Sequence, residues 1–446
     1  MSDRRLERAL ARLGGVRAPV EVKGRVTALT GLVLRARLPG VHAGELVRIR
    51  MAGREADRTR GADGGELEAE VVGFSGDEVI LMPLGDPSGV GPDSLVEAAG
   101  LAELGVGEAL LGRVLDGLGR PLDGESPAGQ LTPWPLARSA PDPLSRPRIT
   151  RPLQLGVRAL DGLLTVGEGQ RVGLFAGSGV GKSTLLGQIA RQTNADICVV
   201  CLVGERGREV REFIEESLGE EGLSRSVVVC ATSDVPPLVR LKSAQVATAI
   251  AEYFRACGSR VLLLMDSVTR YARALREVGL AAGEPPARRG YPPSVFAALP
   301  KLLERTGTSP EGSITAIYTV LVEGGDMEEP IADEVRGILD GHVVLTRDLA
   351  QRNHWPAIDI LQSLSRVMSQ ITDSTHQKAA AELRQLLAAY ERRRDLIALG
   401  AYERGSEPQT DRAIDLMPRL EAYLCQHPNE ENTLEQSVEA LQALFD

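Results

Sequence analysis

Aromatic side chains are scarce in this chain and make up 3% of its 446 residues. Phe74 is the only aromatic residue before Trp134, so the first third of the sequence lacks the rings on which unpaired bases stack. Basic residues are outnumbered, 51 Lys and Arg against 61 Asp and Glu, which gives a net charge of −10. Nucleic acids are bound mainly through their phosphates by basic surfaces. We therefore expect no nucleic-acid partner, although a local basic groove is compatible with this composition.

Long apolar runs are absent, since none reaches the roughly 18 residues that a membrane-spanning helix needs. No signal peptide is recognisable, so the sequence predicts a soluble, cytoplasmic chain. Five cysteines, an odd number, favour a reducing compartment. Cys198 and Cys201 have the spacing of a redox or zinc pair, but both lie in an apolar run, 196–203, that is typical of a buried strand. Side chains three residues apart on a strand point to opposite faces, so we interpret both as packing residues.

Glycine, in contrast, is abundant and forms the most informative segment of the chain. That segment is Ala176-Gly177-Ser178-Gly179-Val180-Gly181-Lys182-Ser183-Thr184. An apolar run at 172–175 precedes it, and Leu185 and Ile189 after it share one helical face. A glycine loop between a strand and a helix is the context of a P-loop, whose backbone N–H groups surround phosphate oxygens.

The chemistry expected of this loop is the binding of ATP. Lys182 would contact the β- and γ-phosphates, and the Ser183 hydroxyl would bind Mg²⁺. Ala176 stands where the usual pattern has glycine, and its small side chain keeps the loop compatible with a nucleotide. The alternative is a glycine-rich turn without a ligand.

Changes in periodicity divide the chain into four parts. Residues 1–18 are basic and amphipathic, and form either a frayed terminal helix or a docking helix for a partner or an anionic membrane surface. Short apolar strands separated by glycine turns predict a small β-barrel at 19–92. Strands at 172–176, 197–203, 227–231, 261–265 and 314–322 alternate with helices, which predicts an α/β domain with a mostly parallel sheet at 93–372. Helical spacing of leucines and a capping box at 433–436 predict a helical domain at 373–446.

Two further segments place charged side chains after predicted strands. Asp266 ends the apolar run 261–265, which is the Walker B form, and would hold Mg²⁺ at the carboxyl edge of the sheet. Glu205 and Arg206 follow the strand at 197–203. A carboxylate there can orient the attacking water, and an arginine can stabilise charge on the transferred phosphoryl group. From the residues alone, a solvated charge cluster at 204–209 is the alternative.

Three motifs together resemble the rotary ATPase α/β superfamily. They are the P-loop, the segment 204–209 and the segment 356–366, Pro-Ala-Ile-Asp-x-x-x-Ser-x-Ser-Arg. Within that superfamily, the stretches 111–119, 290–296 and 338–342 are most similar to the type III secretion ATPases, and we favour their injectisome branch. The resemblance runs from about Arg25 to Arg404. It implies a RecA-like P-loop ATPase core with an N-terminal β-barrel and a C-terminal helical domain.

The resemblance also implies roles for individual residues. Glu205 would activate the attacking water, with Arg206 beside it in the phosphate site. Arg366 would reach the γ-phosphate of the neighbouring subunit, a contact that is worth about 10³–10⁵ in rate. Trp355 stands where many relatives have tyrosine and would stack on adenine; core packing is the alternative.

Other charged segments are less specific. The segment 283–293 matches the family's pore-facing loop, where Arg288 and Arg289 would meet an acidic stalk or substrate; without the resemblance it is only a stiff, proline-rich loop. The acidic run at 323–334 is expected to form a solvated loop. His342 and His354 have no partner at ligand spacing, so no metal is expected there.

The resemblance implies a homohexamer. One chain carries both Glu205 and Arg366, and a head-to-tail contact can close into a ring. ATP hydrolysis would then drive the release of export substrates from chaperones and their unfolding. The implied partners are central stalk and stator proteins at the cytoplasmic face of the inner membrane.

The alternative functions are a flagellar export ATPase, an ATP synthase subunit, a ring-shaped RNA helicase and a non-catalytic nucleotide-binding subunit. The last of these would usually lack Glu205.

Overall fold

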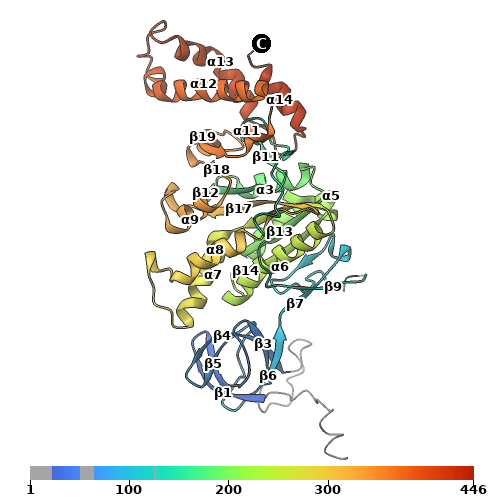
Figure 1. The fold of residues 1–446 in the computed structure, drawn as a ribbon. Coiled ribbons are helices and arrows are strands. Elements are labelled where there is room, and N and C mark those ends of the chain that lie inside the picture. The colour runs from blue at the N-terminus through green and yellow to red at the C-terminus, as the bar shows by residue number, and fades with distance from the viewer. Residues whose placement is uncertain (1–22, 51–64, 125–126, 128, 446) are drawn as a thin grey trace, which may run out of the picture. The chain divides into compact units, whose positions relative to one another are not determined.

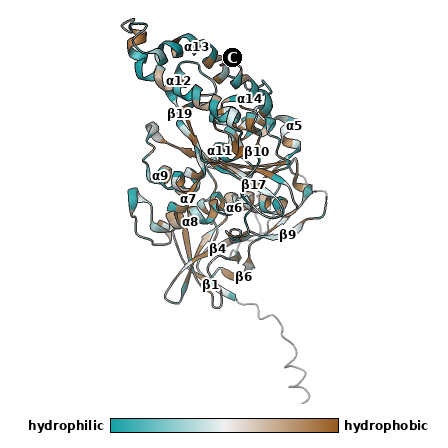
Figure 2. Ribbon diagram, turned by 45° about the horizontal axis from the view of Figure 1, so that its top comes forward, coloured by the Kyte–Doolittle hydropathy of each residue, from teal (hydrophilic) through white to brown (hydrophobic). Residues whose placement is uncertain are grey.

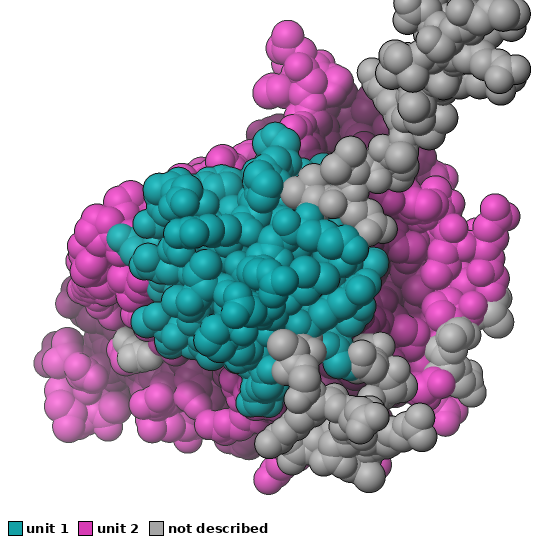
Figure 3. All heavy atoms as spheres, turned by 90° about the horizontal axis from the view of Figure 1, so that it is seen from below, with its two compact units in different colours: residues 1–102, 281–283 teal, residues 103–280, 284–446 magenta. Residues whose placement is uncertain are grey.

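The structure is a computed structural model that describes residues 23–50, 65–124, 127 and 129–445. The predicted basic segment 1–18 lies outside the described residues. The chain divides into two compact units, residues 1–102 with 281–283 and residues 103–280 with 284–446 (Figure 3). In the part of the chain that is described, no helix is both long and apolar enough to cross a membrane.

The first unit is a closed barrel with the strand order β1-β2-β5-β4-β3-β6 (Figure 1). Its strands are β1 Lys23–Thr30, β2 Val33–Arg37, β3 Glu45–Arg50, β4 Glu66–Ser75, β5 Glu78–Pro83 and β6 Leu95–Leu101. Alternate residues face the core, which includes Leu34, Val47 and Leu81. The barrel therefore extends to Leu101 and not only to residue 92. The sequence underestimates it because β6 has a single buried residue, Val96, and lacks the alternation of a half-buried strand.

The second unit is built on a nine-stranded sheet with the order β19-β18-β12-β17-β15-β13-β14-β8, in which β16 also pairs with β17. The strands are β8 Val114–Leu115, β12 Arg171–Ala176, β13 Ile197–Glu205, β14 Ser226–Thr232, β15 Arg260–Asp266, β16 Gly307–Thr308, β17 Ser313–Leu321, β18 Gly341–Leu345 and β19 Ile358–Ser365. The five strands expected from the sequence are confirmed, and they pair in parallel. Only β16 and β19 run antiparallel to their neighbours. Both faces of the central strands are covered, which explains their continuous apolar runs.

Helices cover both faces of this sheet. They are α2 Arg158–Leu163, α3 Lys182–Gln192, α4 Gly207–Glu212, α5 Gly219–Ser224, α6 Pro237–Ala256, α7 Val268–Ala281, α8 Pro293–Leu303, α9 Pro330–Ile338, α10 Arg347–Gln351 and α11 Met368–Ile371. The long helix α6 packs against β13, β14, β15 and β17. Two small sheets, β7 Glu103–Val106 with β9 Thr132–Pro135 and β10 Pro152–Leu153 with β11 Val166–Gly167, complete the unit. Cys198 and Cys201 are free, buried residues of β13, as predicted.

The C-terminal helices α12 Ser374–Ala398, α13 Pro408–Leu424 and α14 Leu434–Gln442 share a hydrophobic core with the sheet. Leu383, Leu420 and Leu441 belong to the same buried cluster as Leu163 and Ile360. Figure 2 shows mostly hydrophilic colours along α12 and α13 and hydrophobic colours along the central strands. The capping box that opens α14 is confirmed. The helical region is therefore part of the second unit.

Candidate active site

The loop between β12 and α3 has a conformation that glycine adopts most readily. Gly179 and Gly181 have φ angles of 77° and 78°, which carry a steric cost for other residues. The helix α3 begins at Lys182, and no side chain caps its first N–H groups because its N-cap residue is Gly181. Residues of this loop line a cavity of about 740 Å³. Free N–H groups and the positive end of a helix dipole make this loop a site for an anion.

Three of the predicted residues meet at the end of the loop. The Nζ atom of Lys182 lies 2.5 Å from both carboxylate oxygens of Asp266 and 3.6 Å from Oε1 of Glu205. Oε2 of Glu205 lies 2.9 Å from Nη1 of Arg270. The Thr319 hydroxyl donates to Oδ1 of Asp266 at 2.7 Å. Two acidic side chains, Glu205 and Asp266, and two basic ones, Lys182 and Arg270, therefore cluster at the carboxyl edge of the parallel sheet.

Burial makes the carboxyl group of Glu205 a weaker acid than an exposed glutamate. Its exposed fraction is 5%, and this burial raises its pKa to about 7, with the negative charge of Asp266 adding to the rise. Lys182 and Arg270 oppose the rise. Within the described residues, Oε1 of Glu205 has no hydrogen-bond partner. A carboxyl group with a pKa near neutrality and an oxygen that accepts no hydrogen bond suits a group that orients water or accepts a proton.

The other predicted residues on this side line the same cavity. Ser183 and Thr184 are exposed in the first turn of α3. Arg206 lies at the rim, with its Nη1 atom 3.0 Å from Oε1 of Glu209. A hydroxyl at Ser183 and a carboxylate at Asp266 are hard oxygen donors of the kind that Mg²⁺ prefers. The residues present therefore fit a magnesium-bound triphosphate.

Trp355 lies against the P-loop. A Cβ atom added at Gly181 would lie 2.8 Å from Cζ3 of the Trp355 ring. The indole Nε1 donates to Oδ1 of Asn353 at 3.0 Å, which helps to fix the ring. An aromatic ring beside the phosphate-binding loop offers a surface for a nucleotide base.

Arg366 lies at the other edge of the sheet. It follows β19, which runs antiparallel to β18, so that Ser365 pairs with Gly341 at the start of β18. The backbone N–H of Arg366 donates to Asp340 O at 3.0 Å. The strand β12 starts beside Asp340 and ends five residues later at the P-loop, a rise of about 16 Å. The sheet therefore separates Arg366 from the P-loop of its own chain.

Family comparisons match three parts of the chain. The nucleotide-binding domain of the ATP synthase alpha/beta family matches residues 156–365, and the β-barrel domain of that family matches residues 26–100. The C-terminal domain of the type III secretion ATPase EscN matches residues 372–443. The type 3 secretion system ATPase of Xanthomonas euvesicatoria is 51% identical over 443 residues, which cover 99% of this chain and 97% of the relative. The chain belongs to the type III secretion ATPases of the ATP synthase alpha/beta family.

Two further relatives are similarly close to this chain. The flagellum-specific ATP synthase of Bacillus subtilis is 53% identical over 422 residues, 94% of each chain. The structure of the assembled ATPase EscN from enteropathogenic E. coli superposes with a TM-score of 0.88 at 48% identity, covering 94% of this chain and 99% of EscN. These findings confirm the predicted fold class and show that the chain is an ATPase.

The sequence did not indicate several residues of this ATPase that line the cavity at the P-loop or contact Asp266. Arg270 and Arg273 come from α7, and Arg347 from the start of α10. Arg270 is four residues after Asp266, so helical spacing after the Walker B strand could have indicated it. Arg347 and Thr319 come from distant parts of the chain, and no local pattern marks them.

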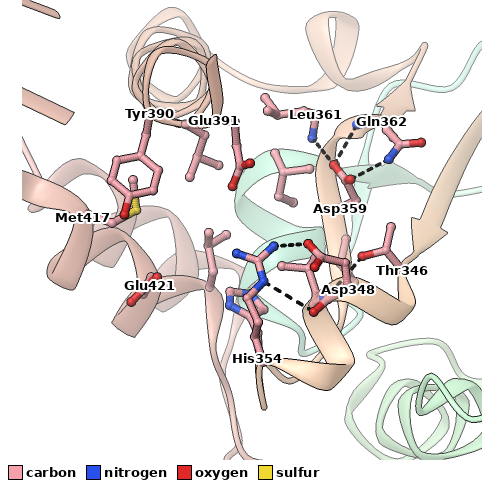
Figure 4. A pocket seen from close by; sticks show the side chains of 16 residues that line it. Thr346, Asp348, His354, Asp359, Leu361, Gln362, Tyr390, Glu391, Met417 and Glu421 are labelled. Carbon is pink, nitrogen blue, oxygen red and sulfur yellow. Dashed lines mark hydrogen bonds and ion pairs between the residues drawn. The ribbon is translucent and has the colours of Figure 1, made fainter. Parts of the chain in front are cut away.

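A separate cavity of about 410 Å³ lies between α10, β19, α12 and α13 (Figure 4). Asp359 of the Pro-Ala-Ile-Asp motif lines it and accepts hydrogen bonds from Leu361 N, Gln362 N and the Gln362 side chain. The other carboxylates that line this cavity belong to Asp348, Glu391 and Glu421, whereas Arg352 is the single arginine in the lining. This excess of negative charge makes it unsuitable for phosphate.

The arginines of the expected pore loop form ion pairs with the acidic run at 323–334 of the same chain. Arg288 lies 3.6 Å from Asp333, and Arg289 lies 3.3 Å from Asp326, so part of the acidic run is engaged by the expected pore loop. His342 bonds to Gln362 O, and His354 lies 3.4 Å from the Cys425 thiol, a neighbour that its sequence position does not reveal. Across the described ranges, no three His, Cys, Asp or Glu side chains group as ligands for a metal ion.

Proposed function

We propose that copies of this chain form a homohexameric ring that hydrolyses ATP between neighbouring subunits, and that this drives chaperone release and unfolding of substrates of an injectisome. The supporting observation is the separation of two sets of groups. Lys182, Glu205 and Asp266 gather at one edge of the sheet, while Arg366 is exposed at the other. A second copy in head-to-tail contact would complete the site.

The described residues suggest a division of labour in this site. The N–H groups of the P-loop and Lys182 would hold the β- and γ-phosphates, and Trp355 would stack on the adenine. Glu205 would orient the attacking water and take its proton, with Arg206 at the rim of the phosphate site. Mg²⁺, held through Ser183 and Asp266, would neutralise phosphate charge when bound. The neighbour's Arg366 would stabilise the charge that develops on the γ-phosphoryl group.

The proposed partners rest on the relatives. One solved structure contains assembled EscN and another contains EscN with its central stalk EscO, which supports a ring around a stalk for this chain. Stator proteins, chaperone–substrate complexes and a position at the cytoplasmic face of the inner membrane are carried over from the family resemblance.

Mixing two inactive variants tests the proposal. Lys182→Ala removes the P-loop lysine and keeps the arginine, whereas Arg366→Ala does the reverse. We expect each alone to be inactive, and Arg366→Ala to bind a nucleotide analogue with unchanged affinity as an isolated chain. An equal mixture should recover about a quarter of wild-type turnover, because half of the P-loops are intact and half of those meet an intact arginine. A mixture that stays inactive although it assembles would reject the shared site.

A flagellar export ATPase is the second candidate. The identity to the flagellum-specific ATP synthase of Bacillus subtilis, 53%, is as high as that to the type 3 secretion relative, 51%. The genes beside this one distinguish the two: needle and translocon genes support the injectisome, and hook and filament genes support the flagellum.

A further inference from the structure

Gln170 is a fully buried amide at the entry to β12, with an exposed fraction of 0%. Its Oε1 accepts from Gly167 N at 2.8 Å. Its Nε2 donates to two acceptors, Asp340 O and the Ser365 hydroxyl, both at 3.1 Å. A buried carboxamide with all of these partners is strongly oriented, because each unmade bond would leave a polar group unsatisfied.

Both acceptors are directly connected to the Arg366 backbone. Asp340 O also accepts the N–H of Arg366 at 3.0 Å. Ser365 directly precedes Arg366, and its hydroxyl donates onward to Thr165 O at 2.9 Å. One amide group therefore holds both the carbonyl that binds the Arg366 N–H and the side chain next to it.

The strands at this point are unusually close. A Cβ atom added at Gly341 would lie 2.6 Å from Leu364 O and 3.3 Å from Nε2 of Gln170. Only glycine at this position lets β18, β19 and the Gln170 amide approach as they do.

The Arg366 guanidinium itself is exposed and has no hydrogen bond or ion pair with any other described residue. No contact with the described part of the chain holds the guanidinium, so what the surrounding structure fixes is the position of the Arg366 backbone from which the side chain extends. We propose that Gln170 is a positioning residue for Arg366, which orients the arginine toward the neighbouring subunit's nucleotide. This inference rests on the proposed function, because it requires Arg366 to act on a neighbour.

The competing role for Gln170 is within its own subunit. Gln170 directly precedes β12 and the P-loop lies at the other end of that strand, so a disturbance at Gln170 could instead distort the subunit's own phosphate site. The two roles differ in which subunit is impaired, and a mixed ring separates them.

The variant Gln170→Met keeps an unbranched side chain of similar length and removes the three hydrogen bonds. We expect kcat to fall by about 10²-fold, the effect of misplacing a catalytic group by about 1 Å, and KM for ATP to stay within about twofold because uniform binding is unaffected. The matched control is Gln154→Met, which removes a half-buried amide that bridges Gln192 O and Leu434 N and makes no hydrogen bond to Gln170, Asp340 or Ser365. It should keep wild-type turnover.

Mixing with Lys182→Ala chains decides between the roles. If Gln170 acts through Arg366, the Lys182→Ala chains supply a well-placed arginine, and the mixture recovers turnover as the Arg366→Ala mixture does. Recovery with Arg366→Ala but not with Gln170→Met would overturn the positioning role and leave the proposed function intact. No recovery with either would reject the arginine shared between subunits. Full activity of Gln170→Met alone would also overturn the inference.

A milder variant covers the case in which Gln170→Met does not fold. Ser365→Ala removes one acceptor of the amide and also the hydrogen bond to Thr165 O, and we expect kcat to fall by at least about tenfold. The same mixing experiment should restore it. A defect of Ser365→Ala that Lys182→Ala chains cannot restore would count against the inference.

Discussion

The burial of Glu205 predicts how ATP hydrolysis depends on pH. Its pKa of about 7 implies that about a tenth of the carboxyl groups are ionised at pH 6 and about nine-tenths at pH 8. Only the ionised form can accept a proton from water. We therefore expect kcat/KM for ATP, which reports on the free enzyme, to rise about tenfold per pH unit below 7 and to level off above it.

The variant Glu205→Gln removes the titrating group and keeps the size of the side chain. General base catalysis typically contributes about 10²–10⁴ in rate, so turnover should fall at least a hundredfold at pH 8. The rise below pH 7 should disappear with it. Nucleotide affinity should be retained, since Lys182 and the N–H groups of the P-loop are untouched.

Steady-state turnover from pH 5.5 to 8.5 at constant ionic strength measures both effects. Glu212→Gln is the control, because Glu212 is a nearby acid on α4 that pairs with Arg208 at 2.5 Å, outside the cavity lining. It should keep the wild-type profile. A Glu205→Gln profile parallel to that of the wild type, or turnover within tenfold of it, would refute the assignment of Glu205 as the water-activating group.

The same pKa has a consequence for stability. The pKa of Glu205 rises from an ordinary 4.5 to about 7, so the folded protein holds this proton more tightly than the unfolded chain. Its stabilising contribution is complete below pH 4.5 and is lost as the pH rises through 7, by about 3 kcal/mol. Relative to the wild type, Glu205→Gln should therefore gain unfolding free energy between pH 5 and pH 8. A pH-independent difference in urea unfolding would contradict this.

Three other substitutions test individual contacts of the structure. Gly181→Ala should cost about 1–2 kcal/mol for its left-handed φ and displace the Trp355 ring, which thermal unfolding and the indole fluorescence would detect; unchanged values for both would be inconsistent with the described contact. Trp355→Ala should raise KM for ATP by about 5- to 150-fold, the equivalent of 1–3 kcal/mol of base stacking, whereas Trp355→Tyr should retain most of the affinity. Glu252→Ala should destabilise the fold by about 3–5 kcal/mol in chemical unfolding, because it leaves the buried Arg305 without its partner at 2.8 Å; a loss below about 1 kcal/mol would mean that this ion pair is dispensable.

Much of the fold could be predicted because its signals are local. A strand buried on both faces needs a continuous apolar run, so the strands that end at Ala176 and Asp266 are visible in the sequence. The left-handed angles of the P-loop require glycines, and these also stand side by side in the chain. The barrel strand β6 was missed because burial at Val96 alone produces no periodic pattern.

The amino-acid sequence by itself determined the kind of chemistry, since the P-loop, the apolar run that ends at Asp266 and the Gly-Glu-Arg segment at the end of β13 are each contiguous. Only the tertiary structure decided which groups meet. The order of the strands brings Arg270 and Thr319 to the acids, and the reversal of β19 carries Arg366 to the far edge, where Gln170 bonds to the preceding Ser365. Local conformation follows from neighbouring residues, whereas these contacts join positions up to about two hundred residues apart and depend on how the whole sheet packs.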